Sequence, residues 1–431
     1  TGAGAILQIS GSMTNNGTVN NSGAATLAGT LTNNVNFNTL AGFSLNVNAG
    51  ATLTNTGNVN NAGSLTNNGT ITNNNQFVNT GTASNNGVFN NNNVLNNQVG
   101  GTFNNNAGSS MSLNFGTQLL NGGTFTNASG INSFGLIQND ATFTNNGTIT
   151  SNSGGQVDNN GLNFTNNGTL STSDQFRNDG TFFNQGIINV SAGSVLNNFG
   201  NFTNRSGGTM NNLQEIRNKQ PNGIFTNNGT LNNNVRFFAE DDVINNAFFN
   251  SIGDVFIEPG GGKITNTELL YLNAGNLKNQ GTLVNSNKIW VNDCSTLNNV
   301  AGATINNNGN LELHGILFQR GTLAGNAVNN QGGYIHTAPT SAAPSVCQNG
   351  TFAADINGDV KVYASQLISN ANFDSCANIV YLANGQDRPV FHCSDIGTVL
   401  NLNVVLRTRL LDSLTCVAQV TPVDLLEPQF S

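Results

Sequence analysis

An apolar residue returns at every sixth position between residues 53 and 95, and this spacing constrains the fold more than any other feature of the chain. The positions are Leu53, Val59, Leu65, Ile71, Phe77, Ala83, Phe89 and Leu95. A globular core does not require so regular a period, whereas short strands joined by regular corners do. Three sides of six residues give a coil of about eighteen, so the spacing predicts an all-β fold, a parallel β-solenoid whose coils stack on one another.

A second set of residues recurs with the same period between the apolar positions. It consists of Gly57, Gly63, Gly69, Asn75, Gly81, Gly87 and Asn93. Glycine and asparagine adopt a positive φ at the lowest cost. We therefore expect a left-handed residue at each corner, and we expect the stacked Asn side chains of successive coils to form hydrogen-bonded ladders along the axis.

Phenylalanines extend the pattern beyond residue 100 with wider spacing. The periodic ones are Phe103, Phe125, Phe143, Phe164, Phe182, Phe202 and Phe225. Their spacing predicts coils of about 18 to 22 residues, the longer ones carrying loops at their corners. The phenyl ring needs no hydrogen-bond partner, so these side chains are expected to point into the interior.

Charged residues are scarce, and this excludes several classes of function. The first Asp, Glu, Lys, Arg or His is Asp140, so the segment before it lacks the usual groups of acid–base and metal chemistry. The net charge of −8 argues against nucleic-acid binding and against an electrostatic membrane anchor. No apolar run approaches the length of a membrane span. A chain that opens at Thr1 without Met fits a mature, secreted product.

The segment from Phe237 to Lys263 shows the weakest periodicity and is expected to form an outward loop or an irregular coil. It holds the acidic residues Glu240, Asp241, Asp242, Asp254 and Glu258. They could bind Ca²⁺ or serve a polysaccharide lyase or hydrolase, but we favour a solvated acidic loop. His314, His336 and His392 lack metal-ligand spacing. No catalytic, cofactor-binding or metal-binding residue is therefore assigned.

The composition changes near residue 337. We expect the solenoid over 1–336, a linker over 337–346, and a separate domain over 347–431 that holds four of the five cysteines. Asp355-Ile-Asn-Gly-Asp359 is typical of a hairpin turn. The alternation of Leu400, Leu402, Val404 and Leu406 indicates a half-buried strand, and together these features predict a β-sandwich.

Several short motifs of this C-terminal segment occur together in one known family. They are Cys347, Asp355-Ile-Asn-Gly, Asp374-Ser-Cys376, Phe391-His-Cys-Ser-Asp-Ile-Gly397 and Thr415-Cys-Val-Ala-Gln-Val. The segment resembles the four-cysteine Ig-like repeat domains of large secreted surface proteins, chiefly of Bacteroidota. It departs from them at Ala377, where glycine usually follows the second cysteine, and over 407–414, which replaces the usual turn. The solenoid likewise resembles the Asn/Gly/Thr repeats of bacterial β-helical adhesins. Both resemblances imply a bacterial surface or extracellular protein.

The cysteines of this domain are the disulfide candidates. Four cysteines allow three pairings, and the sequence does not choose among them. We favour Cys376 with Cys393 across one hairpin and Cys347 with Cys416 between the first and last strands, which would imply an oxidising, extracellular setting. Cys294 is left over, as a small apolar filler of the stack or as one half of an intermolecular disulfide.

The expected function is that of an extracellular structural or adhesive protein, the subunit of a filament assembled head to tail. The segment Thr1-Gly-Ala-Gly-Ala-Ile-Leu-Gln-Ile enters the solenoid without a helix or a charged residue, which favours strand addition, unless residues outside this chain cover the edge. Other copies of the chain and surface glycans are the expected partners, and no cofactor is expected. The alternative is a carbohydrate-active β-helix enzyme, which would need carboxylates and basic groups gathered on one face.

Overall fold

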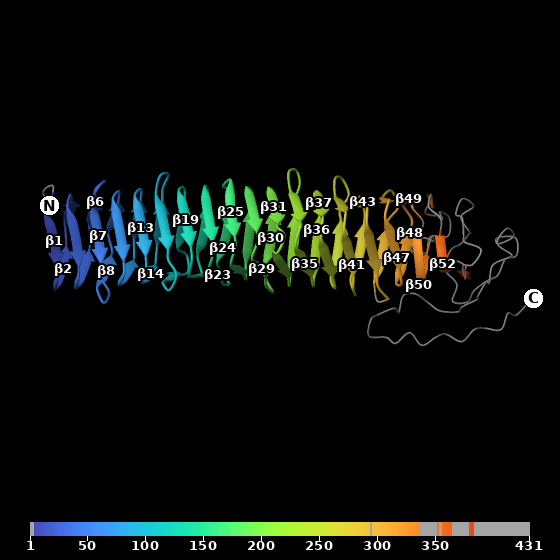
Figure 1. Ribbon diagram of the computed structural model, residues 1–431, viewed down its shortest axis with the longest axis horizontal. Coiled ribbons are helices and arrows are strands. Elements are labelled where there is room, and N and C mark those ends of the chain that lie inside the picture. Colours follow the sequence, from blue (N-terminus) through green and yellow to red (C-terminus); the bar gives the residue numbers. More distant parts are fainter. Residues whose placement is uncertain are drawn as a thin grey trace, which may run out of the picture. The chain divides into compact units, whose positions relative to one another are not determined.

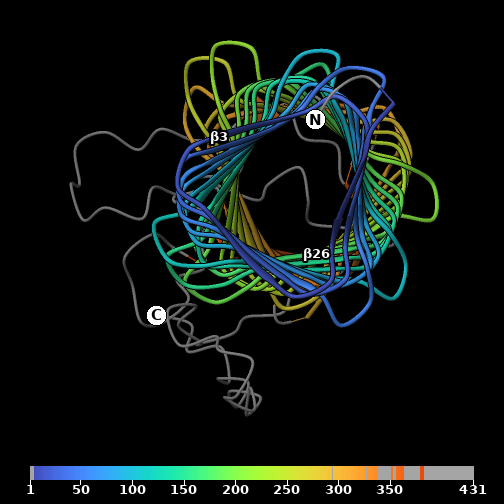
Figure 2. The same ribbon diagram turned by 90° about the vertical axis from the view of Figure 1, so that its left-hand side faces the viewer.

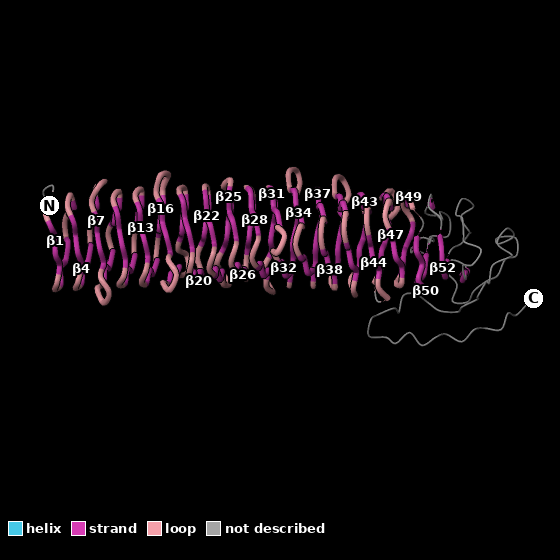
Figure 3. Tube along the Cα trace, in the orientation of Figure 1, coloured by secondary structure: helices cyan, strands magenta, loops and turns pink. Residues whose placement is uncertain are grey.

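The computed structural model describes residues 4–293, 295–326, 328–336, 351–352, 356–363 and 379–382. These residues form an all-β parallel β-solenoid of about 16 turns, and none of them lies in a helix (Figure 3). The described part of the chain therefore contains no helix long and apolar enough to cross a membrane. The chain divides into two compact units, Thr1–Ile216 and Arg217–Ser431.

Each turn of the first unit consists of three four-residue strands, and each strand pairs in parallel with the strand one turn later (Figures 1 and 2). The solenoid therefore has three faces. The first face contains β1 (Ile6–Ile9), β4 (Ala24–Leu27), β7 (Ser44–Val47), β10 (Ser64–Asn67), β13 (Thr82–Asn85), β16 (Thr102–Asn105), β19 (Thr124–Asn127), β22 (Thr142–Asn145), β25 (Asn163–Asn166), β28 (Thr181–Asn184) and β31 (Asn201–Asn204).

The second face of this unit contains β2 (Ser12–Asn15), β5 (Thr30–Asn33), β8 (Thr52–Asn55), β11 (Thr70–Asn73), β14 (Val88–Asn91), β17 (Ser110–Leu113), β20 (Gly130–Ser133), β23 (Thr148–Ser151), β26 (Thr169–Thr172), β29 (Ile187–Val190) and β32 (Thr209–Asn212). The third face contains β3 (Thr18–Asn21), β6 (Asn36–Thr39), β9 (Asn58–Asn61), β12 (Gln76–Asn79), β15 (Val94–Asn97), β18 (Gln118–Asn121), β21 (Leu136–Asn139), β24 (Gln156–Asn159), β27 (Gln175–Asn178) and β30 (Val195–Asn198). The boundary between the units falls within β33 (Glu215–Asn218).

The second unit repeats this arrangement. Its first face contains β34 (Ile224–Asn227), β37 (Asp242–Asn245), β40 (Lys263–Asn266), β43 (Thr282–Asn285), β46 (Thr304–Asn307), β49 (Thr322–Gly325) and β51 (Thr351–Phe352). Its second face contains β35 (Thr230–Asn233), β38 (Phe248–Ser251), β41 (Leu269–Leu272), β44 (Lys288–Val291) and β47 (Asn310–Leu313). Its third face contains β36 (Arg236–Ala239), β39 (Asp254–Ile257), β42 (Asn276–Asn279), β45 (Thr296–Asn299) and β48 (Ile316–Gln319). The long strand β50 (Val328–His336) pairs with both β47 and β48.

The interior follows from the period of two along a strand. The second and fourth residues of nearly every strand are buried, the second apolar and the fourth most often Asn, as with Leu65 and Asn67 of β10. On the first face the buried phenylalanines stack turn upon turn. Ring centroids lie 5.0 Å apart between Phe103 and Phe125, 4.7 Å between Phe125 and Phe143, and 4.6 Å between Phe143 and Phe164. Phe225 of the second unit is also fully buried. The expected inward orientation of these rings is confirmed.

The buried asparagines form the expected ladders. Along the first face, Asn127 Nδ2 donates to Asn145 Oδ1 at 2.7 Å, and Asn145 Nδ2 donates to Asn166 Oδ1 at 2.7 Å. Each amide also reaches the main chain, as when Asn145 Nδ2 donates to the carbonyl of Thr169 at 3.0 Å. These bonds replace the hydrogen bonds to water that a buried amide loses on folding, so the ladders tie successive turns together. Among the described ladder asparagines, Asn61 Oδ1 is the exception, because it is buried without a partner beside Thr39 of the preceding turn.

The expectation of a left-handed residue at every corner is wrong. No non-glycine residue of the described chain has a positive φ, and the recurring Gly69 and Gly87 do not have one either. These glycines instead allow close approach of two turns, since a Cβ on Gly69 would lie 2.3 Å from the carbonyl oxygen of Ala51. Asn75 and Asn93 stand at the same register, so the corner does not demand glycine in every turn.

Positive φ occurs in a second, longer kind of corner. Gly42, with φ of 83°, lies in a four-residue turn in which the N–H of Phe43 donates to the carbonyl of Leu40 at 3.1 Å. This is the position that a type II turn reserves for glycine. Each such turn lengthens a coil by two residues, which explains why ladder partners are 18 residues apart from Asn55 to Asn73 but 24 apart from Asn97 to Asn121. The latter coil exceeds the expected upper limit of 22.

Two further expectations are corrected. The segment 237–263 is not an irregular loop, because it contains the regular strands β37, β38 and β39. The expected hairpin at 355–359 is not formed, because Asn357 and Gly358 lie within β52 (Ile356–Tyr363), which pairs in parallel with β50 and with β53 (Ile379–Leu382). The linker and Cys294, Cys347, Cys376, Cys393 and Cys416 lie outside the described residues.

Candidate functional site

The acidic residues of 240–258 are not brought together as a site. Glu240 lies 3.1 Å from Arg217 Nη1 and 3.0 Å from Lys219 Nζ, so its charge is paired. Asp242, on the first face, lies 3.6 Å from Lys263 Nζ. Asp254, on the third face, accepts a hydrogen bond from Asn276 at 2.9 Å. Within the described residues no group of three or more His, Cys, Asp or Glu side chains could hold a metal ion.

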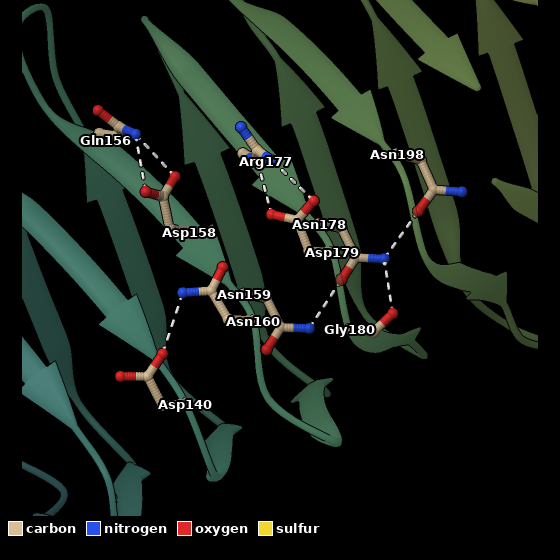
Figure 4. A network of polar contacts seen from close by, with 10 residues as sticks. All are labelled: Asp140, Gln156, Asp158, Asn159, Asn160, Arg177, Asn178, Asp179, Gly180 and Asn198. Carbon is tan, nitrogen blue, oxygen red and sulfur yellow. Dashed lines mark hydrogen bonds and ion pairs between the residues drawn. The ribbon is translucent and has the colours of Figure 1, made fainter. Parts of the chain in front are cut away.

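A polar network lies on the third face of the first unit, where the first charged residues of the chain appear (Figure 4). Gln156 and Asp158 both point outward from β24, and Gln156 Nε2 donates to the two carboxylate oxygens of Asp158 at 2.8 Å. One turn later Arg177 of β27 forms a two-pronged ion pair with Asp179, with Nη2 3.0 Å from Oδ1. Strand register places Asp158 beside Arg177.

The electrostatics of this network differ from one group to the next. Burial raises the pKa of Asp158, an effect that the hydrogen bond from Gln156 and the charge of Arg177 oppose and that the carboxylates of Asp179 and Asp140 increase. The hydrogen bond to Asp179 raises the pKa of Arg177. A carboxyl with a raised pKa is the kind of group that can act as a general acid, although structural ion-pair networks also shift pKa values.

Three aromatic side chains form an outward column on the second face of the second unit. Ring centroids lie 5.1 Å apart between Tyr271 and Trp290 and 5.7 Å apart between Trp290 and His314. Lys288 Nζ lies 4.5 Å from the Trp290 ring centroid. The only tryptophan of the chain therefore contacts a ring in each neighbouring turn and a cation on its own strand.

Glu312 connects Lys288 and His314 beside this column. Its carboxylate lies 2.8 Å from Lys288 Nζ and 2.9 Å from His314 Nε2. Burial would raise the pKa of Glu312, but hydrogen bonds from Lys288 and His314 outweigh it and hold the pKa below its usual value. The arrangement stabilises adjacent turns by an ion-pair network that is partly shielded from water.

Sequence reasoning missed both clusters. Tyr271 and Trp290 stand at the outward third positions of β41 and β44, one turn apart, so a search for aromatic residues at coil spacing could have found them. His314, which lacks metal-ligand spacing in the sequence, contacts Trp290 and Glu312. The side chain of His336, and all of His392, lie outside the described part of the chain.

Fold and surface together define the class to which the chain belongs, a parallel β-solenoid with buried Asn ladders and a mostly uncharged exterior. Comparison with protein-family models, with curated proteins and with solved structures found no match to the chain.

Proposed function

We propose that this protein is an extracellular structural or adhesive component, the subunit of a surface or extracellular filament. The observation that carries the proposal is the interior, in which the ladder amides bond to one another from turn to turn. Repeat proteins gain their stability from such contacts between neighbouring repeats, so the fold can be extended turn by turn. It displays long β-sheet faces to its surroundings, as a scaffold or adhesive element requires.

In head-to-tail assembly, another copy would stack on the first turn that the structure describes. Leu7, Met13 and Val19 occupy the inward second positions of β1, β2 and β3 but are only half-buried, whereas Leu27 and Leu31 in the next turn are fully buried. A further β-coil stacked on this turn would bury the three side chains and pair its strand edges. The proposed occupant is the C-terminal region of another copy, in a heterologous contact.

Electron microscopy of the purified chain at high concentration tests the assembly. Leu7→Glu places a charge in the proposed interface, whereas the neighbouring Gln8→Glu, on an exposed outward side chain, is the matched control. Filaments of the parent and of Gln8→Glu, but not of Leu7→Glu, support the proposal. Single particles of the parent at every concentration, or filaments that persist in Leu7→Glu, contradict it.

The extracellular setting and the C-terminal Ig-like domain belong to the same proposal. They are supported by the motifs around Cys347, Cys376, Cys393 and Cys416. Non-reducing peptide mapping of native protein is expected to find two disulfides among these four cysteines. Four free thiols in protein isolated under alkylating conditions would contradict both the domain and the oxidising compartment.

The second candidate is a carbohydrate-active enzyme, and the polar network of the third face favours it, because Asp158 is a carboxyl with a raised pKa among other carboxylates. We propose that the network is structural and that the protein is not an enzyme. Acidic and neutral polysaccharides should survive incubation with the purified chain, with or without Ca²⁺. Turnover that is lost in Asp158→Asn would establish the enzyme instead. Glycan-array binding without turnover would fit an adhesive role.

A further inference from the structure

The outward side of the first face carries a lattice of small polar side chains, most of them with a hydroxyl group. Side chains at the first and third positions of a strand point away from the interior, and in β16, β19 and β22 these are Thr102, Asn104, Thr124, Thr126, Thr142 and Thr144. The strands β10, β13 and β25 continue the lattice with Ser, Thr and Asn only. Six consecutive turns thus present two parallel columns of small polar side chains without a charge or an aromatic ring among them.

Strand register keeps both columns straight. Thr102 pairs with Thr124, which pairs with Thr142, and the third positions pair in the same order. The rings of Phe103, Phe125 and Phe143 lie directly beneath, and their centroid separations of 5.0 and 4.7 Å show that the turns repeat evenly. The stacked, fully buried rings also fix the strands from below, so the outward side chains stand on a rigid support.

These side chains have no partners of their own. All are partly or fully exposed, and within the described residues the side chains of Thr126, Thr142 and Thr144 form no hydrogen bond. The third face behaves differently, because Asn60 Nδ2 donates to Asn38 Oδ1 at 2.8 Å and Asn38 Nδ2 donates to Asn20 Oδ1 at 2.7 Å. The first face therefore offers free donors and acceptors, with the threonine methyl groups between them.

We propose that the first face from β10 to β25 binds the surface of an ice crystal. Parallel strands lie about 4.7–4.9 Å apart and residues two apart on one strand about 6.6 Å, repeats that agree to within about a tenth with those of the oxygen lattice on a prism face of ice. Ordered water held by the hydroxyl groups and methyl groups would match that lattice over several turns. Each contact is weak, and binding arises from the number of contacts that a rigid face makes at once.

A crystalline polysaccharide is the competing ligand, and the face suits it less well. Sugar rings are recognised by aromatic side chains and by charged, two-pronged hydrogen-bonding groups. No aromatic ring stands among the outward side chains of the strands β10 to β25, and the half-buried Phe43 reaches the lattice only at its β10 end, where it lines a hollow with Ser64 and Thr82. The inference goes beyond the proposed structural role and does not depend on filament formation, because a single copy carries the complete lattice.

Two measurements on the purified full chain test the proposal. They are thermal hysteresis, recorded below the melting point of ice in the protein solution, and the inhibition of ice recrystallisation. Thr126→Arg inserts a long charged side chain at the centre of the lattice. Gln118→Arg makes the same change at an exposed outward position of β18 on the third face and is the matched control. Circular dichroism verifies that both variants retain the parent's strand content.

The expected result is hysteresis in the parent and in Gln118→Arg, with loss of most of the activity in Thr126→Arg. A parent that neither shows hysteresis nor enters a growing ice crystal overturns the proposal. Equal activity of the two variants overturns the assignment to this face. Co-sedimentation with crystalline cellulose or chitin that is lost in Thr126→Arg, without activity on ice, assigns the face to a polysaccharide instead.

Discussion

Removing one amide from an interior ladder should loosen the solenoid, while removing its neighbour on the surface should not. Asn166 and Asn167 are adjacent in the chain and differ in where they point. Asn166 is fully buried, and its Nδ2 donates to Asn184 Oδ1 at 2.8 Å and to the carbonyl of Ile187 at 3.0 Å. Asn167 Nδ2 donates to Asn146 Oδ1 at 2.8 Å in an exposed ladder.

The magnitude follows from the partners left behind in Asn166→Ala. Asn184 Oδ1 loses its ladder donor, and Asn145 Nδ2 loses its ladder acceptor but keeps the carbonyl of Thr169. A buried polar group without its bond costs about 1–3 kcal/mol, so the two partners and the small cavity together cost about 2–5 kcal/mol. In Asn167→Ala water replaces the lost bond, and the change should stay within about 0.5 kcal/mol.

Hydrogen–deuterium exchange of the main-chain amides measures this difference in stability between the two variants for each turn. Contacts in a repeat fold run between nearest neighbours, so Asn166→Ala should accelerate exchange chiefly in β22, β25 and β28. Asn167→Ala should leave the exchange pattern of the parent unchanged. Equal protection in the two variants would refute the reasoning that the interior ladder holds the turns together.

Three other substitutions test the remaining physical arguments. Phe143→Asp buries an unpaired charge and should lower the free energy of unfolding by several kcal/mol, and the melting temperature with it, whereas Thr144→Asp, its outward neighbour, should have little effect. Similar melting curves for the two variants would contradict the inward assignment. Burial raises the pKa of Asp158, so its charged carboxylate opposes folding at neutral pH. This destabilisation decreases as the pH falls through the raised pKa and is absent below the ordinary pKa of 3.8. Asp158→Asn should therefore stabilise the protein at pH 7 but not at pH 3 in denaturant titrations, and a destabilised variant at pH 7 would oppose this. Glu312 has the opposite effect, because its pKa is lowered in the folded protein. Its charge therefore stabilises the fold above the ordinary pKa of 4.5, and this stabilisation is lost as the pH falls through the lowered pKa. In acid titrations, Trp290 fluorescence should show a transition when Glu312 is protonated, and Glu312→Gln should remove it. A transition that is unchanged in Glu312→Gln would belong to another group.

The hexapeptide spacing of residues such as Leu65, Ile71 and Phe77 was enough to predict the three-sided coil, because the period of apolar residues reports which side chains must be buried. The role of glycine was not predictable from the same pattern. Gly69 allows two turns to approach, whereas Gly42 takes a positive φ. The two differ in sequence only by the spacing of the flanking apolar residues, which is six positions from Leu65 to Ile71 but eight from Phe37 to Leu45.

The surface clusters were harder to predict than the core. Asp158 and Arg177 become neighbours only when the coil length between β24 and β27 is known, and each inserted turn changes that length. The same holds for Trp290 and His314, whose contact joins a strand to the corner of the next turn. Outward positions obey no burial rule, so single-residue patterns reveal them only after the register is fixed.

Proton exchange of the Asn side chains tests whether hydrogen-bonded amides in the buried interior hold the turns together. In NMR spectra of protein with labelled asparagine, the account predicts one class of Nδ2 protons that persists for hours in D₂O, including those of Asn127, Asn145 and Asn166. The exposed amides, such as that of Asn167, should exchange at once. Rapid exchange of every Asn side chain would contradict the account.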